Sequence, residues 1–495
     1  MTPVPLDLPL RPSEAAELAI LIFDQAERKP LNDEVRNRLA ARAAVLRLET
    51  VTPYFGSLVR DPVHPSSYYL AVDAARGEPL LLHLALATAP TSSIFYKLLL
   101  IGRMRRPNGA EIVINSVPFG ASDFDNLEKF VSQIGAAFLP RPQGSRSAIA
   151  VSSGLPAAFA AFRAILKRSG KNLAATAASP AVSNRDFYYA GLCAAIRAGW
   201  REGYTAGIHL AVAGERLSGN SVRPLLAPAE EGSCAGGAMP PCQGLEAARE
   251  TIRGAAGFTK FSIDASSLFR EPENGPALEE QFERSFTAEE RGWIFDDFVR
   301  PFDLGDAVYE FTTGDALRLA VKFGHALKTN EHLHDCIRQA RSALKTGRSF
   351  DFEPSLEGAA TVTTPQELVF WLHWLKARGH GAQLAAPNVS GNSFRPLLAP
   401  VERGSCAGGA VPPCQGLGPG DGPAQRLKEF AAIARHYQCT LSIRSGAGHS
   451  PEALETIARA TIGRVNYRLS PELRLPPESP EYSRYIIQLA EQLVV

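Results

Sequence analysis

Short apolar runs alternate with amphipathic helical windows along the last two thirds of the chain. Eight runs have the length and the β-branched or apolar content of buried strands: 147–153, 173–179, 207–212, 258–266, 350–357, 382–389, 439–446 and 464–470. Strands separated by helices must run parallel, because each crossover helix returns the chain to the same end of the sheet. Eight such units can close on themselves, so the pattern predicts a (β/α)8 TIM-like barrel, with an open doubly wound sheet as the structural alternative.

Residues 1–144 differ from the rest of the chain in their pattern of polar and apolar residues. A polar stretch of helical character, 13–48, precedes strand-like runs such as SYYLAVDA, LLLHLAL and AEIVINSV. The segment FLPRPQGSR has two prolines, a glycine and little apolar content, as is typical of a linker. We therefore predict an α/β protein with a smaller N-terminal α+β domain at 1–144 and the barrel at 145–495.

Local signals identify two helices that matter for the candidate sites. Thr364 is placed as an N-cap, Pro365 follows in the first turn and Glu367 completes a capping box, so a helix is expected to begin there. His332 and His334 look like a pair of metal ligands, but their window is helical. Side chains two residues apart point about 200° apart on a helix, so we expect that these two histidines do not share a metal ion.

A 28-residue element occurs twice. Residues 218–245, SGNSVRPLLAPAEEGSCAGGAMPPCQGL, recur at 390–417 with 24 of 28 positions identical, and nothing around either copy repeats. A duplicated structural unit would carry its flanking helices and strands along, so we interpret both copies as insertions into loops on the site face of the barrel. Each copy has a Cys-x7-Cys pair, wider than the usual zinc spacing, so an irregular loop is favoured over a shared zinc ion.

The composition and charge of the chain indicate which partners and which compartment to expect. The 495 residues are 45% hydrophobic, enough for a sizeable core, and 52 basic side chains nearly cancel 51 acidic ones. This balance gives no electrostatic reason to expect nucleic acid or an anionic membrane as a partner. The chain has no basic region before its first apolar stretch and no run of about 18 apolar residues. Its seven cysteines suit a reducing compartment. We therefore expect a cytoplasmic protein.

Polar residues at the carboxyl ends of the expected strands are the candidates for function, because the loops that follow barrel strands converge around the mouth. These candidates include His209, Asp264, Glu357, Asn388, Arg444, Ser445 and Arg468. Two carboxylates and a histidine from three strands would suit a divalent cation and proton transfer, and the arginines would suit an acidic substrate.

Each of these residues also has a structural alternative. Asp264 is placed where it can cap the following turn, and His209 lies within an apolar run, where a hydrogen-bonded core histidine is common. Glu353 and Glu357 are four apart in a strand and face the same side, so one of them would suit a buried ion pair. Arg444, which lies close to a glycine, would suit a structural salt bridge.

Three barrel segments carry a family resemblance: AGFTKFSIDAS (256–266), SFDFEPSLEGAATVTTP (349–365) and the block 430–470, with weaker similarity at 184–204. In order and spacing they resemble the tagaturonate epimerase family of bacterial hexuronate catabolism, once the two repeated elements are removed. The resemblance covers most of the barrel but little of the first domain. It implies a metal-dependent enzyme that interconverts tagaturonate and fructuronate, which differ at C4.

The resemblance also implies a chemical route and residue roles. C4 is not adjacent to the C2 ketone, so retro-aldol cleavage and re-addition is a reasonable route, with a divalent metal ion polarising the carbonyl. Asp264 matches the family's strand-end aspartate, Glu357 falls where the family has an aspartate, and His209 matches its histidine when a gap is allowed. These three are therefore the expected metal ligands, with Asp264 and Glu357 as catalytic groups. The expected substrate-binding residues are Arg185, Asn388, Arg444, Ser445 and Arg468.

The chain departs from the family pattern at several positions. The family's seventh strand ends in His-Ser-Gly-Ser-Asp-Lys, where this chain has Arg-Ser-Gly-Ala-Gly-His at 444–449. Gly358 replaces a glutamate, and Asn466 and Arg468 replace a histidine and a lysine. Arginine neither ligates a cation nor acts as a base near neutral pH, so the metal is either held differently or lost.

Two hypotheses follow from the sequence. The first is a divergent sugar-acid epimerase whose partner is a small-molecule sugar acid. The alternative is a catalytically inactive paralogue that binds a sugar acid or a protein partner. The replaced histidine, lysine and glutamate favour the alternative, whereas the retention of Asp264 and Glu357 favours the enzyme.

Overall fold

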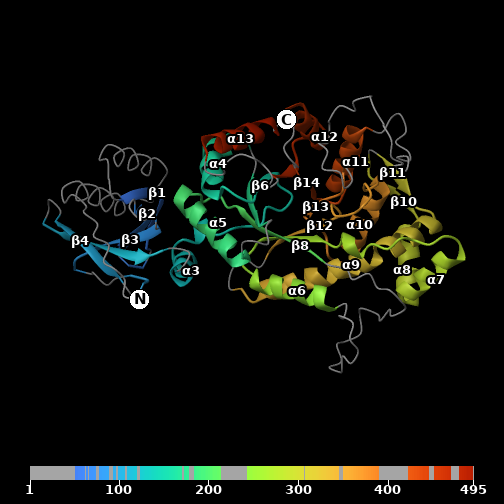
Figure 1. Ribbon diagram of the computed structural model, residues 1–495, viewed down its shortest axis with the longest axis horizontal. Helices are drawn as coiled ribbons and strands as arrows, with labels where there is room; N and C mark the ends of the chain where they lie inside the picture. The colour runs from blue at the N-terminus through green and yellow to red at the C-terminus, as the bar shows by residue number, and fades with distance from the viewer. Residues whose placement is uncertain are drawn as a thin grey trace, which may run out of the picture.

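The computed structural model describes residues 51–493 with interruptions (Figure 1). The interruptions are 62, 65, 74–76, 78, 89–92, 96–97, 106–108, 120–122, 170–171, 178–182, 213–241, 306, 345–348, 390–421, 445–450 and 470–478. A five-stranded sheet lies at one end of the long axis, and an eight-stranded sheet with its helices occupies the rest.

The eight-stranded sheet is a parallel barrel. Its strands are β6 (Ala148–Val151), β7 (Asn172–Ala177), β8 (Thr205–Ala211), β9 (Lys260–Asp264), β12 (Asp351–Ser355), β13 (Leu384–Ala385), β14 (Thr440–Arg444) and β15 (Val465–Arg468). They follow one another around the barrel in chain order, and β15 pairs with β6. All eight strands expected from the sequence are present, so the (β/α)8 prediction is confirmed.

The junction between β12 and β13 completes the circle and excludes an open sheet. Backbone hydrogen bonds run from Gln383 N to Phe352 O at 3.0 Å, from Ala386 N to Pro354 O at 3.2 Å and from Leu356 N to Ala386 O at 2.8 Å. Pro354 has no N–H to donate, and the Gln383 side chain accepts the bond from Phe352 N at 2.8 Å. The ladder is therefore irregular here, which accounts for the short β13.

Successive residues of a barrel strand alternate between the surrounding helices and the barrel interior. In β9, Phe261 and Ile263 belong to the large hydrophobic core between strands and helices. Lys260, Ser262 and Asp264 occupy the alternate positions, and the contacts of Lys260 and Ser262 run to neighbouring barrel strands. β12, β14 and β15 alternate in the same way, so a polar interior is enclosed by an apolar outer face.

The side chains on the opposite side of the barrel interior are smaller. Ala148 and Ala150 of β6 and Ala174 of β7 form a buried cluster of their own, separate from the main core. β7 also contributes the buried Asn172 and Thr176, whereas the charged side chains of the interior lie on β9, β12, β14 and β15.

Helices cover the outside of the barrel. They include α4 (Leu155–Ser169), α5 (Asn184–Ala198), α6 (Cys242–Gly254), α10 (Pro365–Ala377), α11 (Pro423–His436), α12 (Pro451–Thr461) and α13 (Pro480–Gln492). The expected start of α10 is confirmed: Thr364 accepts from Glu367 N at 3.2 Å, and the Glu367 carboxylate accepts from Thr364 N at 2.8 Å.

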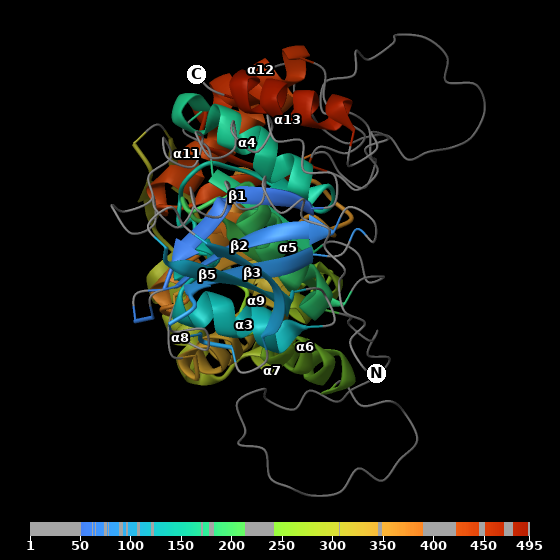
Figure 2. The ribbon, with the colours of Figure 1, turned by 90° about the vertical axis from the view of Figure 1, so that its left-hand side faces the viewer.

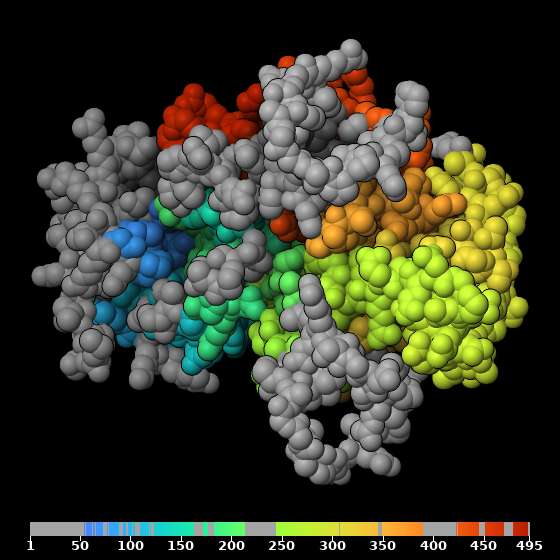
Figure 3. Space-filling model, turned by 45° about the vertical axis from the view of Figure 1, so that its right-hand side comes forward, coloured from blue at the N-terminus to red at the C-terminus, as the bar shows by residue number. Residues whose placement is uncertain are grey.

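The connection from β9 to β12 is much longer than one crossover helix. It contains η2 (Ser266–Leu268), α7 (Pro276–Ser285), α8 (Ala288–Phe298), the hairpin of β10 (Pro301–Asp303) and β11 (Val308–Glu310), and α9 (Thr313–Ser342). α9 has 30 residues, many of them with buried side chains, and α7 and α8 pack against it. The excursion forms the end of the molecule opposite the first sheet (Figure 3).

The first sheet is antiparallel, with strand order β1-β2-β3-β5-β4. Its strands are β1 (Val51–Arg60), β2 (Ser66–Asp73), β3 (Pro79–Leu86), β4 (Leu99–Arg105) and β5 (Glu111–Pro118), followed by α3 (Phe124–Gln133) and η1 (Ala136–Phe138). The sheet stands in front of α5 when viewed along the long axis (Figure 2). Its hydrophobic cluster includes Tyr189, Leu192 and Ile196 of α5, and Arg201 donates to the carbonyls of Gly56 and Leu58 at 2.6 and 2.9 Å.

The segment that was expected to be a linker is bound to the N-terminal end of the barrel. The Asp351 carboxylate, at the start of β12, accepts from Gln143 N at 2.6 Å and Gly144 N at 2.9 Å. Thr440 donates to the carbonyl of Ser145 at 2.6 Å. Hydrogen bonds therefore fix the chain where it enters the barrel, although prolines and glycine make the segment irregular.

Several sequence predictions concern residues outside those described. Residues 218–241 of the first repeated element, the whole of the second element at 390–417, and Ser445 are among them. Among the described helices, none is both long and apolar enough to cross a membrane.

Candidate functional site

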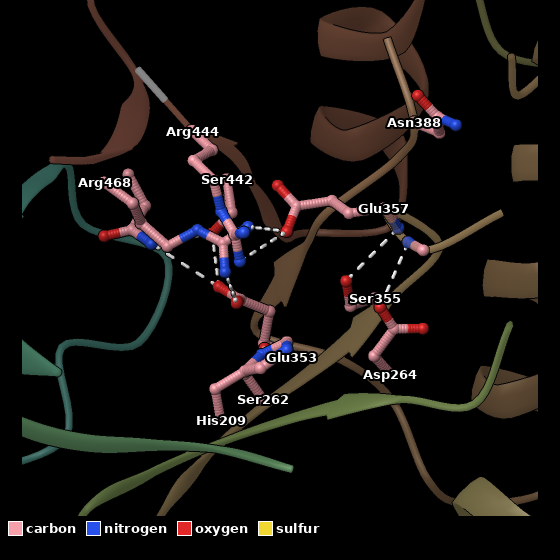
Figure 4. Close-up of polar contacts among 12 residues, drawn as sticks. His209, Ser262, Asp264, Glu353, Ser355, Glu357, Asn388, Ser442, Arg444 and Arg468 are labelled. Atoms are coloured by element: carbon pink, nitrogen blue, oxygen red, sulfur yellow. Dashed lines mark hydrogen bonds and ion pairs between the residues drawn. The ribbon is translucent and has the colours of Figure 1, made fainter. Parts of the chain in front are cut away.

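Polar side chains gather where the barrel strands end (Figure 4). His209 comes from β8, Asp264 from β9, Glu357 from just after β12, Arg444 from β14 and Arg468 from β15. Because the strands are parallel, their carboxyl ends meet at one mouth, as the sequence pattern predicted. The charges of the other four groups all affect the pKa of His209, so the five residues belong to one cluster.

Glu353 lies at the centre of a buried network below the mouth. Its carboxylate is 2.7 Å from Lys260 Nζ and 3.4 Å from the Arg468 guanidinium, and both Lys260 and Glu353 are fully buried. Ser442 donates to the same carboxylate, and Asn466 donates to Ser442 Oγ at 2.6 Å. Burial alone would raise the pKa of Glu353, but Lys260 and Arg468 hold that pKa well below its usual range. Glu353 is therefore the buried ion-pair partner that the strand spacing predicted.

Glu357 is bracketed by two arginines. Its Oε2 pairs with Arg468 and lies 3.5 Å from the guanidinium of Arg444. Arg468 is only 7% exposed, and Glu357 and Glu353 outweigh the effect of its burial and raise its pKa. Arg444 is 42% exposed, so this guanidinium faces the solvent at the mouth. The exposure of Arg444 makes this guanidinium accessible to a ligand carboxylate, whereas Arg468 is part of the interior.

His209 is neutral at physiological pH. Burial is the largest effect on its pKa, and the positive charges of Arg468 and Arg444 add to it, so the pKa lies below the usual value despite Glu357 and Asp264. Its Nδ1 is 3.0 Å from Ser262 Oγ, which fixes the ring. A neutral imidazole held in this way can accept a proton from a hydroxyl group at the mouth.

Asp264 is held by the loops around it. Its Oδ1 accepts from Ser266 N at 3.0 Å and also from Ser266 Oγ, and its Oδ2 accepts from Gly358 N at 3.0 Å. A Cβ at position 358 would collide with Ser266 Oγ and would lie 2.7 Å from Asp264 Oδ2. Glycine therefore allows the backbone to approach the carboxylate. Asp264 caps the turn that follows it, which was the structural alternative.

The fit of the mouth to a divalent cation depends on the spacing and the partners of its donor atoms. His209, Asp264 and Glu357 are not among the described groups whose donor atoms lie within 4.8 Å of one another. The Glu357 oxygen that faces the cluster is shared by two guanidinium groups, which repel a cation. In this arrangement the residues do not fit the ion, and their metal role remains a prediction.

Three further predicted site residues lie away from this cluster or outside the described residues. The Arg185 guanidinium stacks on the rings of Phe124 and Tyr189, 4.5 and 5.7 Å from their centroids, between α5 and α3. Asn388 is buried, and its amide donates to the carbonyls of Ala359 and Thr361 at 2.7 and 3.0 Å, so it shapes the loop after β12. Ser445 lies beyond the described part of β14.

Sequence reasoning missed Lys260, Ser262 and Ser442 as members of the interior network. The signal was present in the strands KFSID, TLSIR and VNYR, where polar residues recur at every second position. Such alternation predicts one polar face. It passed unnoticed because the interior of a small parallel barrel is usually filled by layers of branched apolar side chains.

Comparison with known proteins identifies the fold. No protein-family model matches the sequence, and no curated protein matches it. Among solved structures, the fructuronate-tagaturonate epimerase UxaE from Cohnella laeviribosi is similar in its one-glycerol complex, with 15% identity and a TM-score of 0.57 over 89% of this chain and 75% of that chain. Its two-glycerol complex matches with 16% identity and a TM-score of 0.58 over 88% and 75% of the two chains. At this identity the chain is a distant structural relative of these epimerases and shares their fold.

Proposed function

We propose that the barrel mouth binds a sugar acid and interconverts two of its epimers, with tagaturonate and fructuronate as the first substrates to test. The observation that supports this most is the charged cluster at the strand ends, which contains both a solvent-facing guanidinium, Arg444, and a neutral histidine, His209. A guanidinium binds a carboxylate with two parallel hydrogen bonds, and a neutral imidazole accepts a proton. The fold shared with UxaE supports the same class of substrate.

In this proposal the residues perform a retro-aldol inversion at C4. His209 accepts the proton of the C4 hydroxyl group, the C3–C4 bond breaks, and its electron pair forms the enolate of the C2 ketone. The C4 carbon becomes an aldehyde, turns its other face to C3 and is attacked again, after which His209 returns the proton. Arg444 holds the substrate carboxylate, and the positive charge of Arg468 stabilises the enolate from below.

Asp264 and Glu357 position this cluster in the described arrangement. Glu357 orients Arg444 and Arg468, and Asp264 fixes the loop that carries Gly358. In a metal-dependent form of the reaction, the carboxylates of Asp264 and Glu357 would have to give up these hydrogen bonds and ion pairs in order to bind the metal ion. Elemental analysis of the purified wild type and of Asp264→Ala distinguishes the two forms: stoichiometric divalent metal that is lost in the variant supports the metal-dependent form.

The activity is tested by NMR spectroscopy of each ketohexuronate incubated with the protein, with EDTA or with added Mn²⁺, Ni²⁺ or Zn²⁺. We expect interconversion that His209→Gln slows by about 100-fold or more, as is typical for loss of a general base. Arg444→Ala should raise KM, whereas Arg459→Ala, which removes an exposed arginine paired with Glu455 on α12, should not. Absence of turnover in every condition would contradict the enzyme.

A catalytically inactive binding protein is the second candidate, and one observation favours it. The carboxylates of Asp264 and Glu357 are already engaged by protein donors. Calorimetry with the same ketohexuronates separates the two candidates. Binding that depends on Arg444, without turnover, would identify an inactive paralogue that binds a sugar acid. The absence of binding would contradict both the enzyme and this sugar-acid-binding form, and would leave a paralogue that binds a protein partner.

A further inference from the structure

We propose a second site, unrelated to the mouth, that binds one transition-metal ion such as Zn²⁺ through His334, Asp335 and His380. His334 and Asp335 lie on α9, and His380 lies in the turn between α10 and β13. One donor atom from each side chain lies within 4.8 Å of the others, which no other group of three described histidine, cysteine or acidic residues achieves. The ion would join α9 to the chain that enters β13.

The distances suit a tetrahedral ion. His380 Nε2 is 3.3 Å from Asp335 Oδ1, and His334 Nδ1 is 3.9 Å from the same oxygen. Two ligand atoms bound at about 2.0 Å to a tetrahedral zinc ion are roughly 3.3 Å apart. The His380–Asp335 pair therefore already has the separation of two zinc ligands, and a small rotation of the His334 ring would bring the third nitrogen into place.

The surroundings favour a soft or borderline cation over Mg²⁺ or Ca²⁺. Two of the three donors are imidazole nitrogens, which suit zinc, cobalt and nickel, whereas magnesium and calcium prefer oxygen. The His334 ring packs near Phe350 and Phe352, with 5.1 and 5.0 Å between the ring centroids. Asp335 is 56% exposed and offers an entry path from the solvent.

A hydrogen bond between His380 and Asp335 explains their contact without an ion. It does not explain why the second imidazole stands across from the first, with ring centroids 5.0 Å apart and planes at 88°. His380 Nδ1 is buried and has no hydrogen-bond partner among the described residues. The burial of Nδ1 therefore leaves Nε2, which lies 3.3 Å from Asp335 Oδ1, as the nitrogen of His380 that is available to a cation.

Arg338 opposes the ion. Its guanidinium is 3.3 Å from both His334 Nδ1 and Asp335 Oδ1, where it occupies the space of a cation. The side chain is 59% exposed, so it can turn into solvent at low cost when an ion binds. Removing the Arg338 side chain should therefore tighten metal binding.

The site lies at the opposite end of the barrel from the mouth. His334 contacts Phe350 and Phe352 at the start of β12, whereas Glu357 follows the end of the same strand. The sequence expectation that His332 and His334 do not share an ion agrees with the structure, because His332 Nε2 accepts from Arg249 at 2.8 Å on another side of α9. The partner of His334 is instead 46 residues further along the chain.

The test is titration of the EDTA-treated full-length protein with Co²⁺, followed by the visible absorption of tetrahedral cobalt. We expect one Co²⁺ without a thiolate charge-transfer band, at least tenfold weaker binding in His380→Gln and in Asp335→Asn, and tighter binding in Arg338→Ala. His332→Gln, two residues from His334 on the same helix, should bind as the wild type does. Zn²⁺ should raise the melting temperature of the wild type but not of His380→Gln.

Three outcomes would overturn the proposal. Wild-type protein that shows no tetrahedral cobalt signal would do so, as would a signal with thiolate character that His380→Gln leaves unchanged. Equal losses in His332→Gln and His380→Gln would show that the effect is not specific to the three proposed ligands. Melting curves of each variant with EDTA establish that the variants are folded.

Discussion

The acidic side chains at the two ends of the barrel have different kinds of partner. At the mouth and just below it, Glu353 and Glu357 are paired with Lys260, Arg444 and Arg468. At the N-terminal end, Asp351 is bound by backbone amides, and Asp335 lies beside two histidines in addition to the exposed Arg338. The exposed guanidinium of Arg444 makes the first end suited to an anion, and neutral nitrogen donors make the second end suited to a cation.

The largest expected effect is on Glu353. Glu353→Gln leaves Lys260 buried without its countercharge, and breaking such a pair destabilises a protein by about 3–5 kcal/mol. Urea unfolding measures the loss. Glu455→Gln, in an exposed pair on α12, is the matched control and should cost under about 1 kcal/mol.

A double variant sharpens this prediction. Lys260→Met combined with Glu353→Leu removes both charges, and it should recover much of the stability that Glu353→Gln loses, because well-packed apolar replacements of a buried pair are often neutral. Arg468 retains Glu357 as its partner in that variant. A loss of under about 1 kcal/mol in Glu353→Gln itself would contradict the description of Glu353 as the centre of the network.

Asp351 lies at the N-terminal end of the barrel, and its environment can be tested by the pH dependence of stability. Burial raises its pKa to about 6, although the amides of Gln143 and Gly144 oppose this. Because its pKa is raised in the folded state, Asp351 binds a proton more tightly in the folded protein than in the unfolded chain. The stability that this proton binding contributes is fully present below about pH 4 and is lost as the pH rises through 6. Asp351→Asn does not titrate. Its stability relative to the wild type should therefore improve by at most about 3 kcal/mol between about pH 4 and 7.

Urea unfolding of the wild type and Asp351→Asn across this pH range measures the effect. Subtracting one curve from the other removes the titration of all shared groups. A difference that stays constant with pH would show that folding does not shift the pKa of Asp351. A change in the opposite direction would show that the pKa of Asp351 is lowered in the folded protein, as that of Glu353 is.

Glu357→Gln should strengthen anion binding at the mouth. The variant removes the negative charge that Arg444 and Arg468 share, so we expect up to about tenfold tighter binding of a ketohexuronate, or about 1.4 kcal/mol. Calorimetry measures the affinity, and a neutral ketose is the control ligand, whose affinity should not change. Weaker binding of the sugar acid, together with loss of bound metal, would instead assign Glu357 to a cation site.

The smallest expected effect is at Gly358. Gly358→Ala places a Cβ against the side-chain oxygens of Ser266 and Asp264, both of which can turn away, so we expect a loss of about 1 kcal/mol. The hydrogen bond from the 358 amide to Asp264 should weaken, and NMR of that amide reports it. An unchanged amide signal would show that the loop accepts a side chain without moving Asp264.

The strands were predictable because their outward positions are apolar, as in Phe261 and Ile263, and such runs identify themselves in sequence. The start of α10 was predictable from Thr364 and Glu367, which act within one helical turn. The polar face of the interior was present in the sequence as an alternation, although Lys260, Ser262 and Ser442 were not identified from it. The pairing of either Glu353 or Glu357 was expected from their spacing. These features all depend on neighbours that are close along the chain.

What remained unpredicted depends on contacts between distant segments. The partnership of Lys260 and Glu353 depends on how β9 and β12 are placed side by side, which their separate sequences do not specify. The burial of the Asn388 amide against the loop after β12 has the same origin. His380 joins His334 only because α9 and the turn before β13 meet in space. The excursion of α7 and α8 has no counterpart in a regular (β/α)8 pattern.

Pro354 gives the barrel wall a preferred place to open. The missing amide hydrogen leaves the junction of β12 and β13 with fewer ladder bonds than its neighbours, so local fluctuations should separate these two strands first. Backbone amides of Leu384 and Ala386 should then exchange with deuterium faster than those in the middle of β8 or β9. Such breathing would stretch the hydrogen bonds that join the Asn388 amide to the loop after β12, and it would leave the ion pairs of Glu353 in place.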